Sequence, residues 1–474
     1  MSNRTVDALR IVRHITERPD PVDAIPLGAI ARATATSPSS ASRLCAELAR
    51  SGMLARGSDY GSYSLGPRAI HLSGTAFTPH AHTQRVALTL AAQQTGETVL
   101  LAAPDGAGRL RIVDHITSGW TLHAPAKLGE AIEDPDSASA AAIAIAAGDE
   151  ADPALTESTS GRRTELATVV RAPDGSPMGV LAVRLPTTRA VRNGPRARRA
   201  LGAARRTLES NFHTNEMPTP AHRIEPAARA TEHTRTTIEA ISSLLEEAAA
   251  HPDTTAGLAR RTGLHPDRAR RILQACASEG ITSVAPDTGV HTITWVVQGW
   301  HRARRIPTIT VAGSRLVAAI ADDLDISAFI TTLSGMRSHT LVEELRGVGE
   351  GLAMTSWLGR AHPLIGSDGG PTMLVDFGDA EIHQLFPNRH TPQELMRFTA
   401  LVRRARRDHV LTMQAYDDPS VIAVSAPIRD SSGSVVAAAC LVGSTYDIRS
   451  RSRDIEDAAQ RLGQDVTTAL TRRS

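Results

Sequence analysis

The sequence is poor in aromatic side chains, cysteines and long apolar runs. Aromatic residues make up 3% of its 474 residues, so alanine, leucine and valine must fill most of its cores. Its three cysteines, Cys45, Cys276 and Cys440, are widely separated in apolar stretches, which argues against a disulfide framework or a metal cluster and indicates reduced, buried thiols. No apolar run approaches ~18 residues, and the first ten residues lack a signal-peptide pattern. We therefore expect a cytoplasmic protein with no membrane partner.

The net charge is also low, at +2, so the whole molecule does not attract nucleic acid or anionic lipid by bulk charge. Any contact with nucleic acid must be local. Hydrophobic residues at 41% and charged residues at 22% are typical of a folded soluble protein. A prior of about 150 residues per domain predicts several separate cores.

Two halves of the chain resemble each other through four local matches that occur in the same order. The matches pair residues 5–9 with 237–241, 37–43 (SPSSASR) with 265–271 (HPDRARR), 128–144 with 358–374, and 173–183 with 430–441. Between the halves, residues 213–235 are polar, contain proline and show no sustained period, which indicates a linker. The sequence therefore predicts a duplicated chain.

The second match opens two helices that share one buried stripe. Ala41, Leu44, Cys45 and Leu48 fall at i, i+3, i+4 and i+7, and the same frame recurs 228 residues later. A short helical segment and a tight turn precede each, which is the pattern of a helix-turn-helix. Alternating residues around Asp-Tyr-Gly and Asp-Thr-Gly then predict a small hairpin, or wing. The alternative is a plain helical repeat.

The outward faces of these two helices carry the candidate DNA-contacting residues. They are Ser37, Ser39, Ser40, Ser42 and Arg43 in the first copy, and His265, Asp267, Arg268, Arg270 and Arg271 in the second. Serine hydroxyls position the protein on DNA more than they specify a base. Arginine can instead form two hydrogen bonds with one guanine, a contact worth ~1–3 kcal/mol of discrimination between bases. The alternative for the arginines is a solvated face or phosphate contacts without sequence preference. Asp267 would repel phosphate unless an arginine holds it or it is aimed at cytosine N4, and it can instead stabilise the helix amino terminus.

On these residues the sequence resembles the IclR family of bacterial transcription regulators. The resemblance is carried by residues 5–9, 27–34 (LGAIARAT), 40–54 and 61–66 (GSYSLG), by Arg43 and Leu44, and in the second copy by Arg271, Ile272 and Leu273. It implies that a linker helix and a GAF-like α/β effector domain with an antiparallel sheet follow each winged helix. The expected fold class is therefore α+β, with two winged helix-turn-helix domains and two GAF-like effector domains.

The expected domains are a winged helix-turn-helix at 1–68, a truncated effector-like domain at 69–212, the linker at 213–235, a second winged helix-turn-helix at 236–298 and a GAF-like effector domain at 299–474. Paired β-rich runs flank turn residues in both effector regions, as hairpins need. In the first, GDEADPALTESTSGRR at 148–163 replaces the expected helices. We expect a truncated sheet there that packs against the sheet of the C-terminal effector domain and encloses too little volume for a small molecule.

The resemblance implies an effector cavity in the C-terminal half. Its candidate lining residues are Gly359, Ser367, Asp368, Gln414, Tyr416 and Ser425. The sequence departs from the family, which usually has a glycine near His409 and a small polar residue or cysteine near Ala423. Glycine-rich GSDGG at 366–370 lacks the lysine of a P-loop and is interpreted as a helix-entry turn.

No catalytic motif is present in the sequence: it has no Gly-x-Ser-x-Gly elbow and no persuasive Ser/His/Asp or Cys/His arrangement. His80 and His82, with His71 upstream, have no carboxylate or thiol at ligand spacing, so we interpret them as part of a polar linker. We expect no enzyme activity, no cofactor and no metal.

The leading hypothesis is a sequence-specific transcription regulator that binds double-stranded DNA, with a small-molecule effector and a homodimer (a pseudo-tetramer) as further expected partners. The alternative is a ligand-binding or protein-interaction module whose winged helices no longer bind DNA, which the low net charge and Asp267 favour. An enzyme on the GAF-like scaffold is a third hypothesis, and no catalytic group supports it.

Overall fold

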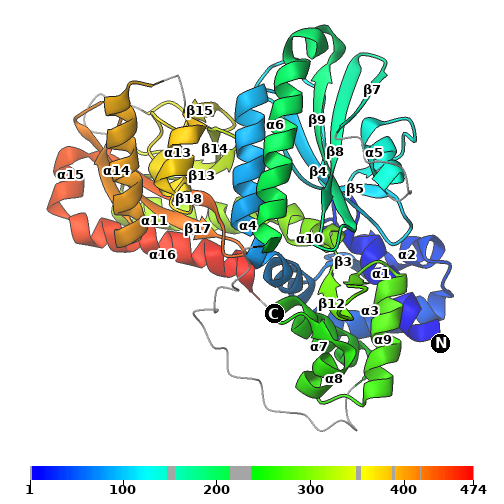
Figure 1. The fold of residues 1–474 in the computed structure, drawn as a ribbon. Coiled ribbons are helices and arrows are strands. Elements are labelled where there is room, and N and C mark those ends of the chain that lie inside the picture. The colour runs from blue at the N-terminus through cyan, green and yellow to red at the C-terminus, as the bar shows by residue number, and fades with distance from the viewer. Residues whose placement is uncertain are drawn as a thin grey trace. The chain divides into compact units, whose positions relative to one another are not determined.

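The computed structural model describes residues 3–146, 155–213, 236–347, 354–386, 390–416 and 418–472. Residues up to 303 form one compact unit, and residues 304–472 form a second. Both units combine helices with antiparallel sheets (Figure 1). The first unit contains the second candidate helix-turn-helix segment together with the N-terminal half of the chain. The predicted linker lies outside the described residues beyond His213, where a helix ends.

Three helices and a small sheet form the N-terminal segment. They are α1 (Asn3–Thr16), β1 (Ile25–Pro26), α2 (Leu27–Ala33), α3 (Pro38–Arg50), β2 (Leu54–Arg56) and β3 (Ser62–Leu65). Helix α3 starts where the sequence predicts, because Pro38 has the fixed φ of a first helical residue and Ser37 caps it. The strands are antiparallel in the order β1-β3-β2, and the predicted β2–β3 hairpin is confirmed.

The segment after residue 236 has the same element order. It contains α7 (Thr237–Ala250), β10 (Asp253–Thr254), α8 (Thr255–Thr262), α9 (Pro266–Ser278), β11 (Thr282–Val284) and β12 (Val290–Ile293). Thr236 and Glu239 form a capping box at the start of α7, and Pro266 opens α9 as Pro38 opens α3. The strand order β10-β12-β11 repeats that of the first small sheet. A 3₁₀ turn (Trp295–Val297) and α10 (Gln298–Ala303) complete the unit.

A six-stranded antiparallel sheet lies between these two segments in the sequence. Its elements are α4 (Pro67–Thr95), β4 (Thr98–Pro104), β5 (Leu110–Ile116), β6 (Ala131–Ile132), α5 (Ala138–Ala146), β7 (Thr156–Ser160), β8 (Arg163–Arg171), β9 (Pro177–Pro186) and α6 (Thr187–His213). The strand order is β6-β5-β4-β9-β8-β7. Helices α4 and α6 pack side by side (Figure 1).

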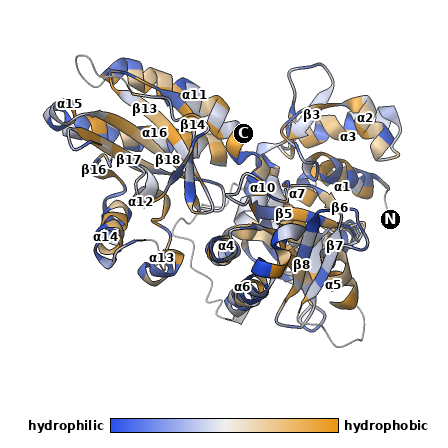
Figure 2. Ribbon diagram, turned by 90° about the horizontal axis from the view of Figure 1, so that it is seen from above, coloured by the Kyte–Doolittle hydropathy of each residue, from blue (hydrophilic) through white to orange (hydrophobic). Residues whose placement is uncertain are grey.

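The second unit is built on a sheet of the same topology. Its elements are α11 (Arg305–Leu324), β13 (Ser327–Ser334), β14 (Arg337–Glu344), β15 (Ala361–Pro363), α12 (Gly370–Met373), α13 (Asp379–Leu385), α14 (Pro392–Asp408), β16 (Leu411–Gln414), β17 (Val421–Arg429), β18 (Val435–Ser444), α15 (Thr445–Ser450) and α16 (Ser452–Thr471). The order is β15-β14-β13-β18-β17-β16. Strands are largely hydrophobic, whereas most helices are hydrophobic on one side and hydrophilic on the other (Figure 2).

The hairpins β8–β9 and β17–β18 close through the same turn. In each, an aspartate carboxylate accepts hydrogen bonds from the N–H group and the hydroxyl of a serine two residues later, at 2.9 and 2.6 Å. The pairs are Asp174 with Ser176 and Asp430 with Ser432. A register shift interrupts both ladders, at 170/171 and at 428/429. The turn residues lie in the fourth sequence match, and each register shift lies just before it.

The expectation of a truncated first sheet is wrong, because that sheet has six strands in the order of the second. The polar residues 156–160 form its edge strand β7, which has no apolar alternation to reveal it in the sequence. The shortening lies in the helices: α12, α13 and α14 lie between β15 and β16, whereas α5 is the helix described between β6 and β7. Residues 148–154 of the stretch that suggested truncation lie outside the described residues.

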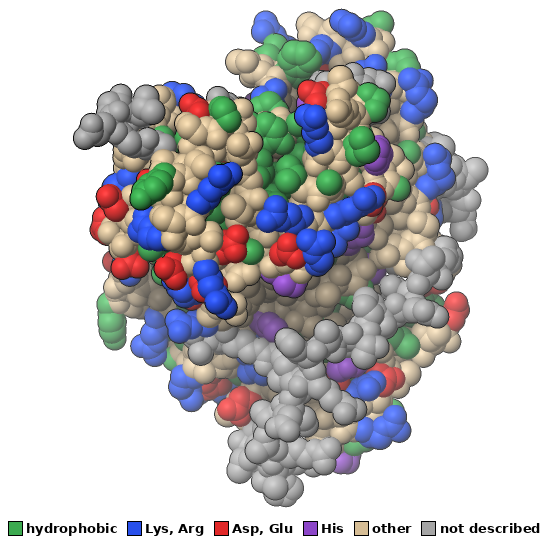
Figure 3. All heavy atoms as spheres, turned by 90° about the vertical axis from the view of Figure 1, so that its left-hand side faces the viewer, with side chains coloured by type: hydrophobic (Ala, Val, Ile, Leu, Met, Phe, Trp, Pro, Cys, Tyr) green, Lys and Arg blue, Asp and Glu red, His purple; other side chains and the backbone are tan. Residues whose placement is uncertain are grey.

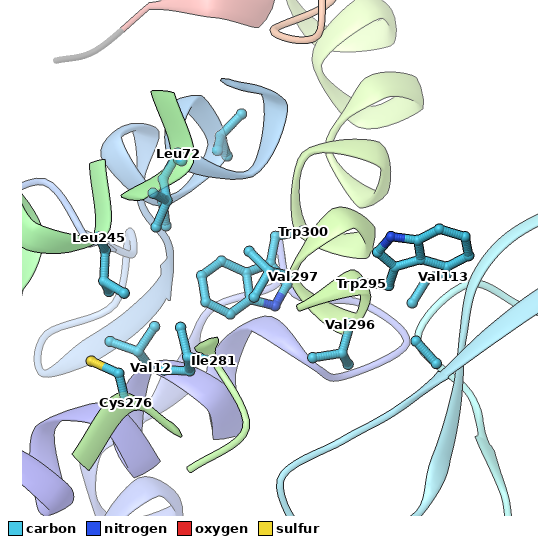
Figure 4. Close-up of a cluster of buried hydrophobic side chains, with 14 of the residues drawn as sticks. Val12, Leu72, Val113, Leu245, Cys276, Ile281, Trp295, Val296, Val297 and Trp300 are labelled. Carbon is cyan, nitrogen blue, oxygen red and sulfur yellow. The ribbon is translucent and has the colours of Figure 1, made fainter. Parts of the chain in front are cut away.

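One hydrophobic cluster extends through the first unit and joins both small segments to the sheet. Trp300, from α10, is 1% exposed and lies at its centre. Around it are Val12 of α1, Leu245 of α7 and Ile281 next to β11, while Val113 of β5 lies nearby beside Trp295 (Figure 4). The side chains that hold the two segments together are therefore the same ones that hold them to the sheet.

We expect Trp300→Ala to lower the free energy of unfolding of the first unit by about 3–5 kcal/mol, because the substitution leaves a large cavity among well-packed neighbours. Chemical denaturation measures this change. Trp120→Ala is the control, since Trp120 is 58% exposed, and its cost should stay below about 1 kcal/mol. Equal costs for the two variants would show that Trp300 does not hold this core.

Candidate nucleic-acid interface

The amino terminus of α3 is built as the sequence predicts. The Ser37 hydroxyl accepts a hydrogen bond from the Ser40 N–H group at 3.3 Å and lies 3.4 Å from the Ser39 hydroxyl. The buried residues of the helix include Ala41, Leu44, Cys45 and Leu48, so the predicted stripe is confirmed. The opposite side of the helix is therefore left facing solvent.

That solvent-facing side carries hydroxyls and one cation. Ser39, Ser42 and Arg43 are exposed, and Ser40 is half-buried. Within the described ranges, Arg43 has no ion-pair partner. Its guanidinium is therefore available to a phosphate or to the edge of a guanine.

The amino terminus of α9 is cationic but internally compensated. The imidazole of His265 caps the helix by accepting from the Asp267 N–H group at 3.3 Å. The Asp267 carboxylate forms an ion pair with Arg270. The Arg271 guanidinium donates through Nε to the Asp267 carbonyl at 3.2 Å, and Arg268 donates to the Thr236 carbonyl at 3.4 Å. Asp267 would repel phosphate unless an arginine held it, and Arg270 does so here.

The hairpins β2–β3 and β11–β12 differ in the same sense. The first has Arg56 at the end of β2 and Tyr60 at its tip, with the tyrosine fully exposed. In the second, the hydroxyls of Ser283 and Thr292 lie 2.8 Å apart across the strands, and Asp287 stands in the turn. Tyr60 is a candidate contact that the sequence analysis missed; an aromatic residue between two turn residues, in a chain with so few aromatics, was the available signal.

The two segments meet within the first unit through residues at equivalent positions. Ser73 of α4 and His301 of α10 are 228 residues apart, the same offset that separates the two recognition-type helices. The Ser73 hydroxyl lies 2.8 Å from His301 Nδ1, donates to the Val297 carbonyl at 2.6 Å and accepts from the His301 N–H group at 3.1 Å. Arg68 and Glu246 form a further ion pair between the segments at 2.6 Å.

The three histidines interpreted as a polar linker lie inside helix α4, so that interpretation is wrong. His80 packs beside Trp295 with ring centroids 6.3 Å apart and the ring planes tilted by 53°, and burial lowers the pKa of His80 to about 4. The described residues contain no group of three or more His, Cys, Asp or Glu side chains that could hold a metal ion. In the same ranges, no helix is long and apolar enough to span a membrane.

Some of the candidate effector residues meet on one face of the second sheet. Ser425 of β17 is buried, and its hydroxyl lies 2.7 Å from that of Thr372 in α12. Ser367 accepts a hydrogen bond from the Ser338 hydroxyl at 3.1 Å. Tyr416 bonds to the Gly366 backbone, and burial together with the charge of the neighbouring Asp368 raises its pKa.

The other candidates lie elsewhere. Gln414 pairs across the sheet with Ile422, whereas Ser425 pairs with Leu411, so Gln414 and Ser425 face opposite sides. Gly359 lies in the turn before β15 with φ 70° and donates its N–H group to the Thr340 carbonyl at 2.9 Å. Six candidates chosen along the sequence therefore do not form one constellation.

The turn at 366–370 lies directly on the sheet and enters α12, as predicted. A methyl group on Gly369 would lie 2.7 Å from the Thr331 side chain and 3.0 Å from the sulfur of Cys440.

His409 stands where the family usually has a glycine, and its backbone shows why glycine suits this position. His409 ends α14 with φ 58°, the left-handed conformation that favours glycine. On the face drawn in Figure 3, basic and acidic side chains are interspersed.

Residues 7–58 match the family model of the IclR helix-turn-helix domain. The match covers most of α1, all of α2 and α3, and β2. This segment is therefore an IclR-type helix-turn-helix domain. A search among curated proteins found none that matches the sequence.

Solved structures of IclR regulators are similar to about half of the chain. HmgR of Pseudomonas aeruginosa is 17% identical, covers 49% of this chain and 97% of its own, and has a TM-score of 0.36. An IclR homolog of Microbacterium hydrocarbonoxydans, solved in complex with 4-hydroxybenzoate, is 16% identical, covers 50% of this chain and 99% of its own, and has a TM-score of 0.31.

We expect Gly369→Ala to destabilise the second unit by about 1–3 kcal/mol, because the added methyl group overpacks the contact with Thr331 and Cys440. Gly378→Ala is the matched control, since a methyl group there meets the flexible end of Glu381 at 3.5 Å. Chemical denaturation of both variants measures the difference. A Gly369→Ala variant as stable as the control would show that open space exists above this sheet face.

Proposed function

We propose that this chain is a sequence-specific DNA-binding transcription regulator with two non-identical recognition helices. The observation that carries the proposal is the IclR-type helix-turn-helix at 7–58, followed in the same compact unit by a segment with the same order of helices, strands and helix-opening prolines. Regulators with one such domain need two chains to place two recognition helices on DNA. This chain carries both candidates itself.

A tandem duplication accounts for the likeness of the two segments. Supporting it, Ser73 and His301 meet at the junction although they occupy equivalent positions, as residues near the axis of a two-fold dimer do. The second winged helix then takes the place of a partner subunit's domain. A homodimer of the chain would bring four recognition helices together, and it forms part of the proposal as a pseudo-tetramer.

The two recognition faces suit different DNA contacts. Ser40 and Ser42 on α3 suit phosphates and either class of base edge, whereas the equivalent residues on α9 are Arg268 and Arg270. Arg43 of α3 can present its two terminal nitrogens to guanine O6 and N7, and so can its equivalent on α9, Arg271. Its Nε atom is held by the Asp267 carbonyl, which orients the fork. Arg270, paired with Asp267, is the weaker candidate because an acid already partly neutralises it.

Gating by a small molecule in the second unit would involve the turn at 366–370. The Microbacterium homolog was solved with 4-hydroxybenzoate. A ligand of that size above Ser425 has to displace this turn, because a single methyl group at Gly369 already meets Thr331 and Cys440. We propose that effector binding, where it occurs, moves the turn off the sheet.

A second candidate function is a protein-interaction module whose winged helices no longer bind DNA. The observation that favours it is the Asp267–Arg270 pair, which reduces the positive charge of the second recognition face. A gel shift with DNA from upstream of the chain's own gene discriminates the two, because only the regulator should retard it.

We expect selection from random duplexes, followed by footprinting, to yield a non-palindromic site or two unlike half-sites. The reason is that the first face presents serine hydroxyls beside Arg43, whereas the second presents three arginines and Asp267, so the two faces should prefer different bases. A perfect palindrome protected equally by both copies would contradict the proposal of unlike recognition helices.

We expect Arg271→Ala to weaken binding by about 1–3 kcal/mol and to relax base choice near one half-site, whereas Ser39→Ala costs little. Binding titrations on DNA variants at fixed salt measure both effects. Arg461→Ala, an exposed arginine of the second unit, is the control and should leave binding unchanged. A uniform loss on all sequences would identify Arg271 as a phosphate contact without base specificity.

A further inference from the structure

Helix α1 contacts both recognition helices. At its start, Arg4 forms an ion pair with Glu47 of α3. About 1.7 and 2.5 turns further on, at 3.6 residues per turn, Arg10 and Arg13 bind the carboxylate of Glu279 at 3.0 and 3.3 Å. Glu279 caps the end of α9 and is buried. One helix of the first segment thus sets the position of a helix in each segment.

The turn between β4 and β5 holds the end of α9 from the other side. A methyl group on Gly106 would overlap the carbonyl group of Glu279, and one on Gly280 would overlap the backbone of Gly106. At these two glycines, the backbone of the β4–β5 turn contacts the backbone at the end of α9 directly. No glycine side chain lies between the two backbones that could adjust its rotamer to relieve a shift. Gly106 does not have a positive φ, so its role lies in this contact and not in its conformation.

A buried charge network closes the loop from the turn back to α1. Asp105 accepts from Arg111 at 3.1 Å, and Arg111 donates to the Glu17 carbonyl at 2.6 Å. Glu17 in turn accepts from Arg13 at 2.9 Å. Burial alone would raise the pKa of Asp105. Hydrogen bonds from the Arg109 and Ala107 N–H groups and from the Arg111 guanidinium outweigh burial and lower this pKa. The carboxylate therefore stays ionised and keeps Arg111 in place.

From these contacts we infer that Arg10, Arg13, Asp105, Gly106, Glu279 and Gly280 form a clamp that fixes the separation of the two recognition helices. The clamp ties the end of α9 to α1 and to the first sheet, while α3 is tied to the same helix α1. Its consequence for DNA rests on the proposed function: the protein accepts half-sites at one separation, because α9 cannot shift to follow a displaced half-site. The first sheet then acts as a scaffold for DNA reading.

The clamp can be tested without DNA by measuring the distance between the helices in the full chain. Spin labels at Arg50→Cys and Gln274→Cys, both exposed, report on α3 and α9 in pulsed dipolar spectroscopy. The three native cysteines are buried, and burial raises the pKa of Cys45 and Cys276 to about 12, so they should not react with the label. The parent should give one narrow distance distribution.

Gly106→Ala should make that distribution about twofold wider or shift it, because the methyl group forces the turn away from α9 in a close-packed contact. Ala107→Ser, at the exposed neighbouring residue, is the matched control and should leave it unchanged. If Gly106→Ala does not fold, Glu279→Gln keeps the shape and removes the charge that Arg10 and Arg13 bind, and the same widening is expected. Distributions identical to the parent in the folded variants would overturn the clamp.

The consequence for DNA is tested with duplexes from the selection in which base pairs are inserted between the half-sites. The parent should bind the original separation at least about tenfold more tightly than any other, and Gly106→Ala should lose most of that preference. A parent that binds all separations equally would overturn the inference about spacing. Failure of the parent to bind any selected DNA would overturn the proposed function, while the label distances would still decide whether the clamp exists.

Discussion

The hydrophobic cluster around Trp300 is the interaction on which the first unit depends. A segment of some sixty residues buries little apolar surface alone, and here two segments with the same element order share one core with a six-stranded sheet. Val12, Leu245 and Val113 reach this core from three parts of the chain. Because the core is common, neither segment can move relative to the sheet without exposing apolar surface, which costs about 25 cal/mol per Å². The polar contacts at its rim then select one arrangement among those that burial alone would allow.

The two sheets share a topology but differ in what they pack against. In the first unit, Gly179 of β9 brings its backbone close to the ring of Trp295, and the turn at Gly106 abuts α9. In the second unit, the close approach is made by Gly369, which brings a turn of the same unit onto the sheet. Glycines therefore lie where each sheet makes its close backbone contacts. In the first unit these contacts are with the segment after residue 236, and in the second they are with a turn of the same domain. In the described residues, the first sheet has one helix, α5, where the second has three, which is consistent with the use of the first sheet as a support.

The sequence was most informative where structure is local. The stripe from Ala41 to Leu48 and the hairpin turn at Asp430 depend on neighbours within a few residues, and both were predicted from spacing alone. It was least informative where a contact joins distant segments. Nothing near Glu279 in the sequence indicates that Arg13 binds it, so the grouping of the second winged segment with the first half could not be derived. The polar edge strand β7 and the half-buried His80 were missed for the same reason, because tertiary contacts override their local character.

The buried and exposed residues of the recognition helices are under different constraints. The buried stripe and the cap positions fix where each helix lies, and Glu279 with Arg10 and Arg13 fixes α9 at its far end. Except for the caps Ser37 and His265, none of these groups lies on the outward face at the helix amino terminus. The outward residues can therefore change from serine to arginine without moving the helix, provided that the added charge is balanced, as Asp267 balances Arg270. A single chain that carries both α3 and α9 has this freedom for each helix separately, whereas in a homodimer every change on one recognition helix appears on both.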